Sequence, residues 1–181
     1  EETIGFDPVG IAPIENIVQS EVGIISLDNI DPQSTDPYLF SSIYPSVNDI
    51  PDGNSVDIPS FDLEPVTNDF SFNDFSEAVF STGSLALTII NDLVIPLGDV
   101  DVTLKNSDGT QISGATTTIA GPINSGSQAT GFLDLSGVTL PGSVVIEVTG
   151  SSPGENSVLI DSVAKNSSFS VQIIGSGLEV T

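Results

Sequence analysis

Apolar and polar residues alternate two apart through most of the chain after Ser84, which is the period of a β-strand. In residues 100–104, Val100, Val102 and Leu104 fall on one face, and Asp101 and Thr103 fall on the other. Runs of this kind are bounded by Gly, Asn, Asp and Pro. The pattern predicts strands at 85–90, 100–104, 111–118, 129–135, 143–149, 158–162 and 169–174, with a short edge piece at 178–180.

A hairpin is predicted between the strands at 100–104 and 111–118. Ser107, Asp108, Gly109 and Thr110 separate them. Asp-Gly is a favoured turn dipeptide because both residues tolerate the backbone angles of a tight reversal.

The first 83 residues have a different character, since Asp-Pro and Glu-Pro pairs recur there and break ladders and helices. Only weak strand candidates remain, at 22–27, 56–58 and 70–72. A short helix or 3₁₀ turn is expected within 70–80, with Asn73 or Asp74 as its N-cap. The chain is therefore expected to divide into a Pro- and Asp-rich extended segment with few strands (1–83) and a β-sandwich domain (84–181).

The strands recur at intervals of roughly ten residues with turns between them and no helical period, which favours a sandwich over a βαβ fold. We expect the fold to be all-β: an immunoglobulin-like β-sandwich with a long, loop-rich acidic N-terminal extension.

The cadence of residues 85–149 carries a family resemblance. An Asn-bearing strand, Leu-Ala-Leu-Thr-Ile-Ile-Asn-Asp, leads to Ile95-Pro-Leu-Gly-Asp-Val100, and Leu140-Pro-Gly142 precedes a later strand. This resembles the immunoglobulin-like modules of bacterial and archaeal surface proteins, of the CARDB and LEA14 kind. The resemblance implies the fold and a stalk, adhesion or assembly role, and it transfers no catalytic motif.

The charge of the chain bears on its partners. Its 181 residues hold 25 acidic side chains against two basic ones and carry a formal net charge of -23. Lys105 and Lys165 cannot build the basic stripe that phosphate binding needs, so we expect no nucleic acid partner, and an anionic membrane surface is disfavoured. No apolar run is long enough for a transmembrane segment.

The residues of most catalytic sites are missing. The chain has no His and no Cys, which removes thiolate and imidazole chemistry, and it has no Trp to line glycosidase subsites. We therefore expect no enzymatic activity and no certain cofactor.

One oxygen-rich turn is a candidate calcium site. Asp49, Asp52, Asn54 and Asp57 place carboxylate and amide oxygens around Gly53, and Ca²⁺ takes six to eight such ligands. The spacing departs from the EF-hand loop, and a solvated Asp-rich turn is the alternative interpretation.

Four aromatic residues crowd one segment: Phe70, Phe72, Phe75 and Phe80. They either plug the open end of a sandwich or cover an edge strand, or they form an exposed anchor that binds a neighbouring subunit.

The leading functional hypothesis is a non-enzymatic structural or assembly module of an exported surface protein or multi-protein complex. Its partners would be other proteins or copies of itself, held by β-edge and extended-segment contacts. The alternative is a calcium- or glycan-binding adhesin module. We expect an extracellular or cell-surface location through prokaryotic export, although a salt-rich cytoplasm also favours acidic proteins. A chain that starts at Glu1 is expected to be a processed form or a piece of something larger.

Overall fold

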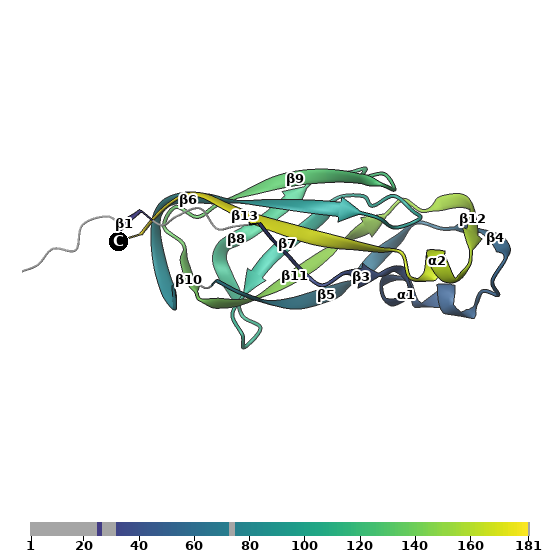
Figure 1. Cartoon of the computed structure of the whole chain (residues 1–181), viewed down its shortest axis with the longest axis horizontal. Coiled ribbons are helices and arrows are strands. Elements are labelled where there is room, and N and C mark those ends of the chain that lie inside the picture. The colour runs from purple at the N-terminus through teal and green to yellow at the C-terminus, as the bar shows by residue number, and fades with distance from the viewer. Residues whose placement is uncertain (1–24, 27–31, 73–74, 181) are drawn as a thin grey trace, which may run out of the picture.

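The computed structural model describes residues 25–26, 32–72 and 75–180 and is dominated by strands (Figure 1). Strand makes up 63% of it and helix 9%, so the prediction of an all-β fold is confirmed. The elements are β1 (Ile25–Ser26), β2 (Gln33–Ser34), β3 (Tyr38–Leu39), α1 (Phe40–Ile43), the 3₁₀ helix η1 (Pro45–Asp49), β4 (Asn54–Ile58), β5 (Phe61–Ser71), β6 (Glu77–Asn91), β7 (Val100–Lys105), β8 (Gln111–Ile119), β9 (Ser127–Asp134), β10 (Thr139–Pro141), β11 (Ser143–Ser152), β12 (Glu155–Ile160), α2 (Ser162–Lys165) and β13 (Ser168–Val180).

These strands form three antiparallel sheets. The seven-stranded sheet is built on β13 and β6; β1, β2 and β3 pair with β13, and β9 and β10 pair with β6. The four-stranded sheet has the order β5-β11-β7-β8, and β12 pairs with β4 in a separate ribbon. The molecule is elongated along its strands, with the β4–β12 ribbon and the short helices at one end and β1 and β10 at the other (Figure 1).

The two larger sheets share one hydrophobic core. Leu85, Leu87 and Ile89 of β6 and Ile146 and Val148 of β11 are fully buried members of the same cluster. Sheets that bury one face against each other satisfy the strand period, because alternate side chains leave the core. The arrangement is compatible with a β-sandwich.

Most predicted strands are present with shifted ends. β7 and β8 begin at the predicted residues, and Val100, Val102 and Leu104 are all buried on one face, as expected. The hairpin is confirmed, since the amide of Asn106 donates to the carbonyl of Thr110 at 2.8 Å. The predicted pieces 169–174 and 178–180 belong to one strand, β13, and of the predicted strand 22–27 only Ile25–Ser26 lies within the described residues.

Strand β5 is longer than the sequence predicts, because the Glu64-Pro65 pair predicts a turn within it. Register against β11 shifts between Val148 and Gly150, opposite the Leu63-to-Val66 step of β5, so Pro65 lies at a β-bulge. Within the described residues β5 pairs only with β11, and a bulge on an edge strand tolerates a residue without an N–H donor.

The helix predicted within 70–80 is wrong for the described residues. Phe70 and Ser71 end β5, and β6 begins at Glu77. The proposed N-caps Asn73 and Asp74 lie outside the described residues. The short helices are instead α1, η1 and α2, and Asp161 caps α2 by accepting from the amide of Ala164 at 2.8 Å.

The division at residues 83 and 84 and the N-terminal extension stay predictions. Residues 1–24 and 27–31 lie outside the described part of the chain. Where the structure describes the first 83 residues, Phe40, Val47, Leu63 and Phe80 belong to the common core, and β6 runs across the predicted boundary.

Candidate functional site

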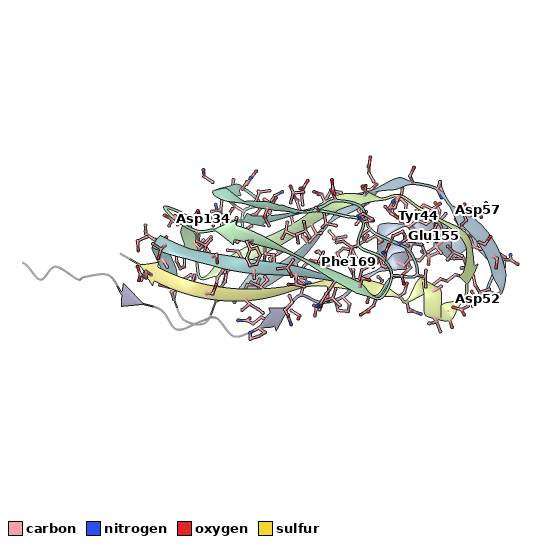
Figure 2. All side chains as sticks on the ribbon, turned by 90° about the horizontal axis from the view of Figure 1, so that it is seen from above. Tyr44, Asp52, Asp57, Asp134, Glu155 and Phe169 are labelled. Carbon is pink, nitrogen blue, oxygen red and sulfur yellow. The ribbon has the colours of Figure 1, made fainter. Side chains whose placement is uncertain are left out.

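The four candidate calcium ligands lie at the end of the molecule that carries the β4–β12 ribbon, where Asp52 and Asp57 are labelled in Figure 2. Asp49 ends η1, and Asn54 begins β4. All four are exposed. The segment folds this way because a turn at Asp52-Gly53 connects η1 to β4, with Gly53 at a φ of 89° that favours glycine.

Two of these carboxylates already have partners. Asp52 accepts from the ammonium of Lys165 at 2.8 Å, and the same ammonium donates to the carbonyl of Ile50 at 2.8 Å. Asp57 accepts from the amide of Ser157 at 2.8 Å and so holds Ser157 in its left-handed conformation, with φ of 54°. These contacts give both side chains a local structural role.

Among the residues that the structure describes, no group of three or more His, Cys, Asp or Glu side chains could hold a metal ion. Calcium binding at Asp49, Asp52, Asn54 and Asp57 therefore stays a prediction drawn from the sequence.

The four phenylalanines form a continuous cluster of ring contacts, of which Phe72–Phe75 is stacked and the other two are edge-on. Centroids are 5.0 Å apart between Phe70 and Phe72, 5.1 Å between Phe72 and Phe75, and 5.7 Å between Phe75 and Phe80. Phe70, Phe72 and Phe80 are buried, and Phe75 is half-buried. This burial agrees with rings that plug the end of the core; partner binding stays a prediction, and Phe75 is the ring with the most exposure to support it.

The sequence predicts extended segments that pair with sheet edges, but it does not locate the short strands at 33–34 and 38–39, which lie at the edge of the seven-stranded sheet. We call residues 25–26 and 32–39 the edge segment. Its three short strands pair with β13 near both ends and at the middle: Ile25 opposite Val180, Gln33 opposite Ile173, and Tyr38 opposite Phe169. No hydrophobic period reveals it, because its pairing is short and interrupted by polar residues.

Two side chains anchor the edge segment to β13. The amide of Thr35 donates to the carbonyl of Val171 at 2.9 Å, and the amide of Val171 donates to the Thr35 hydroxyl at 3.1 Å. Tyr38 packs its ring 5.0 Å from that of Phe169. The segment is thus held at Thr35 by hydrogen bonds and at Tyr38 by apolar burial.

The Tyr38 hydroxyl makes no hydrogen bond of ordinary geometry within the described part of the chain. Burial raises the pKa of Tyr38 to about 12; the nearby Thr35 hydroxyl opposes the rise and the charge of Asp36 adds to it. The phenol therefore stays neutral at physiological pH.

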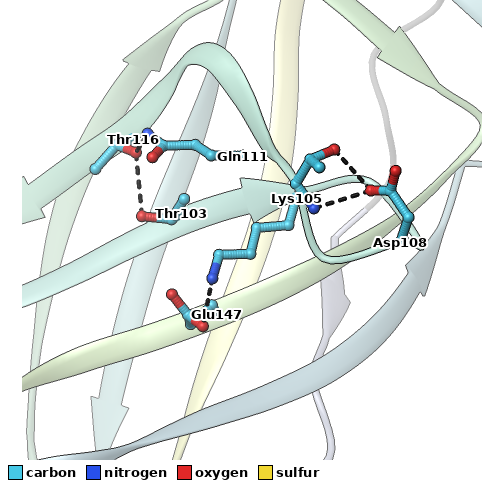
Figure 3. Close-up of polar contacts among 7 residues, drawn as sticks. Thr103, Lys105, Asp108, Gln111, Thr116 and Glu147 are labelled. Atoms are coloured by element: carbon cyan, nitrogen blue, oxygen red, sulfur yellow. Dashed lines mark hydrogen bonds and ion pairs between the residues drawn. The ribbon is translucent and has the colours of Figure 1, made fainter.

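The outer face of the four-stranded sheet is acidic. Asp69, Glu147 and Asp101 project from β5, β11 and β7, with threonines between them. Lys105 donates to Glu147 at 2.6 Å, and next to this pair the Thr116 hydroxyl lies 3.0 Å from that of Thr103 (Figure 3). We call this surface the acidic face.

The outer face of the seven-stranded sheet carries few charges over the middle of β13, β6 and β9; Glu179, whose carboxylate accepts from the Thr82 hydroxyl at 3.3 Å, lies beyond its Ser176 end. Four cross-strand rows on β13, β6 and β9 compose it: Ser176-Ser84-Asp134, Ile174-Ala86-Phe132, Gln172-Thr88-Thr130 and Ser170-Ile90-Gln128. Of these residues only Asp134 is ionisable. The hydroxyls of Thr88 and Thr130 lie 2.8 Å apart, and Phe132 is 69% exposed. We call this surface the neutral face.

Each sheet carries a matching Asp turn. Asp134 accepts from the amide and hydroxyl of Ser136 at 2.9 and 2.7 Å, and Asp108 accepts from those of Thr110 at 2.9 and 2.6 Å. The hydroxyl is the larger cause, the amide the next, and together they hold the pKa of both carboxyls below the ordinary value of 3.8.

Three surface hollows offer little chemistry. One is lined by Phe61, Asp62 and Ser151, and the other two share Ser71, Ser107 and Ser143 beside the phenylalanine cluster. Each contains at most one carboxylate. None of the helices in the described residues combines the length and apolar character needed to cross a membrane.

No family model and no curated protein matches this sequence. Among solved structures the chain is similar to an arabinose-bound α-L-arabinofuranosidase, at 15% identity and a TM-score of 0.36, over 87% of this chain but only 23% of that one. It is also similar to a chain of sacbrood virus of honeybee, at 12% identity and a TM-score of 0.32, over 94% and 96% of the two chains. A chain of infectious bursal disease virus, Gx strain, gives 12% identity and a TM-score of 0.25, over 99% of this chain and 42% of that one. None of these likenesses bears on function.

Proposed function

We propose that this chain is a non-enzymatic structural module of an exported surface protein or multi-protein complex, and that it assembles through strand edges and extended segments. The observation that carries the proposal is the edge segment on β13. Strand addition at a sheet edge is a general mode of protein association, because backbone hydrogen bonds supply the affinity.

The three short strands of the edge segment keep almost one register against β13. From Ile25 to Gln33 the chain advances eight residues while its partner retreats seven, and from Gln33 to Tyr38 it advances five while its partner retreats four. Each pairing is thus offset from the next by one residue. A segment with this complementarity to β13 can pair equally well with β13 of another copy.

Release of the edge segment costs little compared with release of an inner strand. Pro32 and Pro37 have no N–H to donate, and β1, β2 and β3 are two residues long each. By contrast, β6 pairs with β13 from Asn91 to Phe80. Exchange of a short, weakly paired element between identical chains is an inexpensive route to an oligomer.

The chemistry available supports a non-enzymatic role. The sequence lacks His and Cys, and the three hollows hold no pair of carboxylates that could share acid–base work. The immunoglobulin-like form of the sandwich, the resemblance to CARDB and LEA14 modules, and export to the cell surface are parts of this same proposal.

Exchange of the edge segment can be tested with disulfides, because the native chain has no Cys. Ser34 lies directly opposite Gln172, and opposite residues bring their Cβ atoms within about 4.5–5.5 Å. The full chain carrying S34C and Q172C is oxidised at increasing protein concentration. The proposal predicts intrachain bonds in dilute solution and disulfide-linked oligomers at high concentration.

A matched control uses S84C with S176C, which are opposite each other on β6 and β13, where no exchange is proposed. This pair should give only intrachain bonds at every concentration. If S34C with Q172C also gives only intrachain bonds, assembly through this segment is excluded.

A further inference from the structure

One buried hydroxyl of the edge segment has no hydrogen-bond partner. Tyr38 is 7% exposed, and its hydroxyl is the one buried side-chain polar group left without a partner among the described residues. The Thr35 hydroxyl lies nearby, but it already accepts from the amide of Val171 at 3.1 Å. Burial of such a hydroxyl is unfavourable, because it loses its bonds to water and gains none in the protein.

Tyr38 lies next to the point where the chain is firmly held in the core. Phe40 begins α1, is fully buried, and donates its amide to the carbonyl of Ser167 at 2.8 Å. On the other side of Tyr38, Pro37 has no N–H to donate. Release of the edge segment from β13 therefore breaks the contacts of Tyr38 and can leave Phe40 in place.

The ring and the hydroxyl of Tyr38 have opposite effects on this release. The ring packs 5.0 Å from that of Phe169 and favours the paired state through apolar burial. The hydroxyl regains its bonds to water when the segment leaves β13, so it favours the released state. A phenylalanine at this position would keep the first effect and remove the second.

We propose that the Tyr38 hydroxyl controls how often the edge segment leaves β13. The paired state is weaker than burial of the ring alone would make it, and the segment is released more often as a result. This inference deepens the proposed function and rests on it for its role in assembly, because release is the step that precedes pairing with another copy.

The hydroxyl affects the rate of exchange and not its end point. A segment that pairs with β13 of another copy places Tyr38 against Phe169 of that copy, in the same surroundings as before. The unfavourable burial of the hydroxyl is therefore the same in the single chain and in the oligomer. Only the released state, in which the hydroxyl meets water, differs between Tyr38 and a phenylalanine.

Native-state hydrogen exchange of the full chain in dilute solution tests the effect on release without any assembly. The amide of Thr35 donates to the carbonyl of Val171 at 2.9 Å, so its exchange reports release of the segment. Y38F should slow this exchange about five- to hundredfold, because it removes the unfavourable burial of the hydroxyl. Unchanged or faster exchange in Y38F would overturn the inference.

Y44F is the matched control, because Tyr44 is the other of the two tyrosines. The half-buried Tyr44 ring lies 5.9 Å from that of Phe40 and 4.7 Å from that of Phe61, outside the edge segment. Y44F deletes the same oxygen atom as Y38F and should leave the exchange of the Thr35 amide unchanged. If Y44F slows this exchange as much as Y38F does, the effect does not come from the Tyr38 hydroxyl.

Y38A should have the opposite effect to Y38F. It removes the ring that packs on Phe169 together with the hydroxyl, so the Thr35 amide should exchange faster than in the native chain. Slower exchange in Y38A would show that the ring does not hold the segment, and it would also overturn the inference.

The role in assembly is measured in the full chain carrying S34C and Q172C, kept reduced at high protein concentration and rapidly oxidised at intervals. Adding Y38F should slow the appearance of disulfide-linked oligomers about five- to hundredfold and leave their final fraction unchanged. An unchanged rate, or a different final fraction, would overturn control of exchange by the hydroxyl. If no linked oligomers form but Y38F still slows exchange of the Thr35 amide, the proposed assembly fails and the effect of the hydroxyl on release stands.

Discussion

The two larger sheets are alike where they face each other and unlike where they face outward. Leu87 of β6 and Leu104 of β7 are both fully buried in one core. Outside, the four-stranded sheet presents Asp69, Glu147 and Asp101, whereas the seven-stranded sheet presents mostly Ser, Thr, Gln and apolar side chains.

Burial in the core requires apolar side chains on the inner face of both sheets, whereas the outer faces can differ in composition. The concentration of charge on one side therefore reflects the surroundings of each sheet. We interpret the acidic face as the side that stays in water; the edge segment on β13 is the part that we propose meets other chains.

The largest expected effect comes from the inner faces, which should respond alike. L87A and L104A should each lower the free energy of unfolding by about 2–5 kcal/mol, because each leaves a cavity in a close-packed core. Chemical denaturation measures the loss. T103A on the acidic face should cost less than about 1.5 kcal/mol. A loss below that value for only one of the two leucines would contradict the equivalence of the inner faces.

The next largest effect is a difference in stability loss between one buried polar side chain of each sheet. Asn91 of β6 is buried and donates to the carbonyls of Ile95 and Ile123 at 3.1 and 2.8 Å, whereas Ser152 of β11 donates to that of Pro96 at 2.7 Å. N91A should cost about 1–3 kcal/mol and S152A about 0.5–1.5 kcal/mol, since loss of Asn91 breaks more buried bonds. Thermal denaturation that ranks S152A as the more damaging would reverse this interpretation.

A smaller effect is expected on the acidic face. Lys105 and Glu147 are 23% and 22% exposed, so K105A should cost about 0.2–1 kcal/mol. It also removes a positive charge from among the carboxylates, so the stability of K105A should depend on NaCl more steeply than that of the native chain. If the free energy of unfolding changes with salt by the same amount for K105A and for the native chain, the Lys105 charge does not offset repulsion among the carboxylates.

The smallest effect concerns the two Asp turns, one on each sheet. Because the folded pKa of Asp134 and of Asp108 is depressed, each stabilises the fold above its unfolded pKa near 3.8, and this stabilisation is lost as the pH falls through the folded pKa. NMR titration should show both midpoints below 3.8, and S136A and T110A should raise them. Unchanged midpoints would show that the turns do not hold the carboxylates.

The alternation of β7 and the Asp-Gly turn after it could be predicted from the sequence because both are local. Val102 and Leu104 cannot reach solvent from the face that buries Val100, and Gly109 adopts a φ of 85° that the turn requires. Fold class follows from such local signals repeated along the chain.

Contacts between distant residues could not be predicted. Asp52 pairs with Lys165, which lies 113 positions later in the sequence. The spacing of the candidate calcium ligands therefore does not reveal that the Lys165 ammonium already binds one of them. From the sequence alone Pro65 predicts a turn, and only the pairing with β11 shows that it lies at a bulge within a strand. Phe132 directly precedes the buried Leu133 in β9 and therefore points to the opposite, outer face. An apolar residue at this outward position is the sequence signal that could have identified the neutral face.

Oxidation of the full chain carrying S34C and Q172C at increasing protein concentration tests most directly whether the edge segment pairs with β13 of another copy. The account predicts disulfide-linked oligomers whose fraction rises with concentration, whereas S84C with S176C gives intrachain bonds alone. Intrachain bonds alone from S34C with Q172C at every concentration would contradict it.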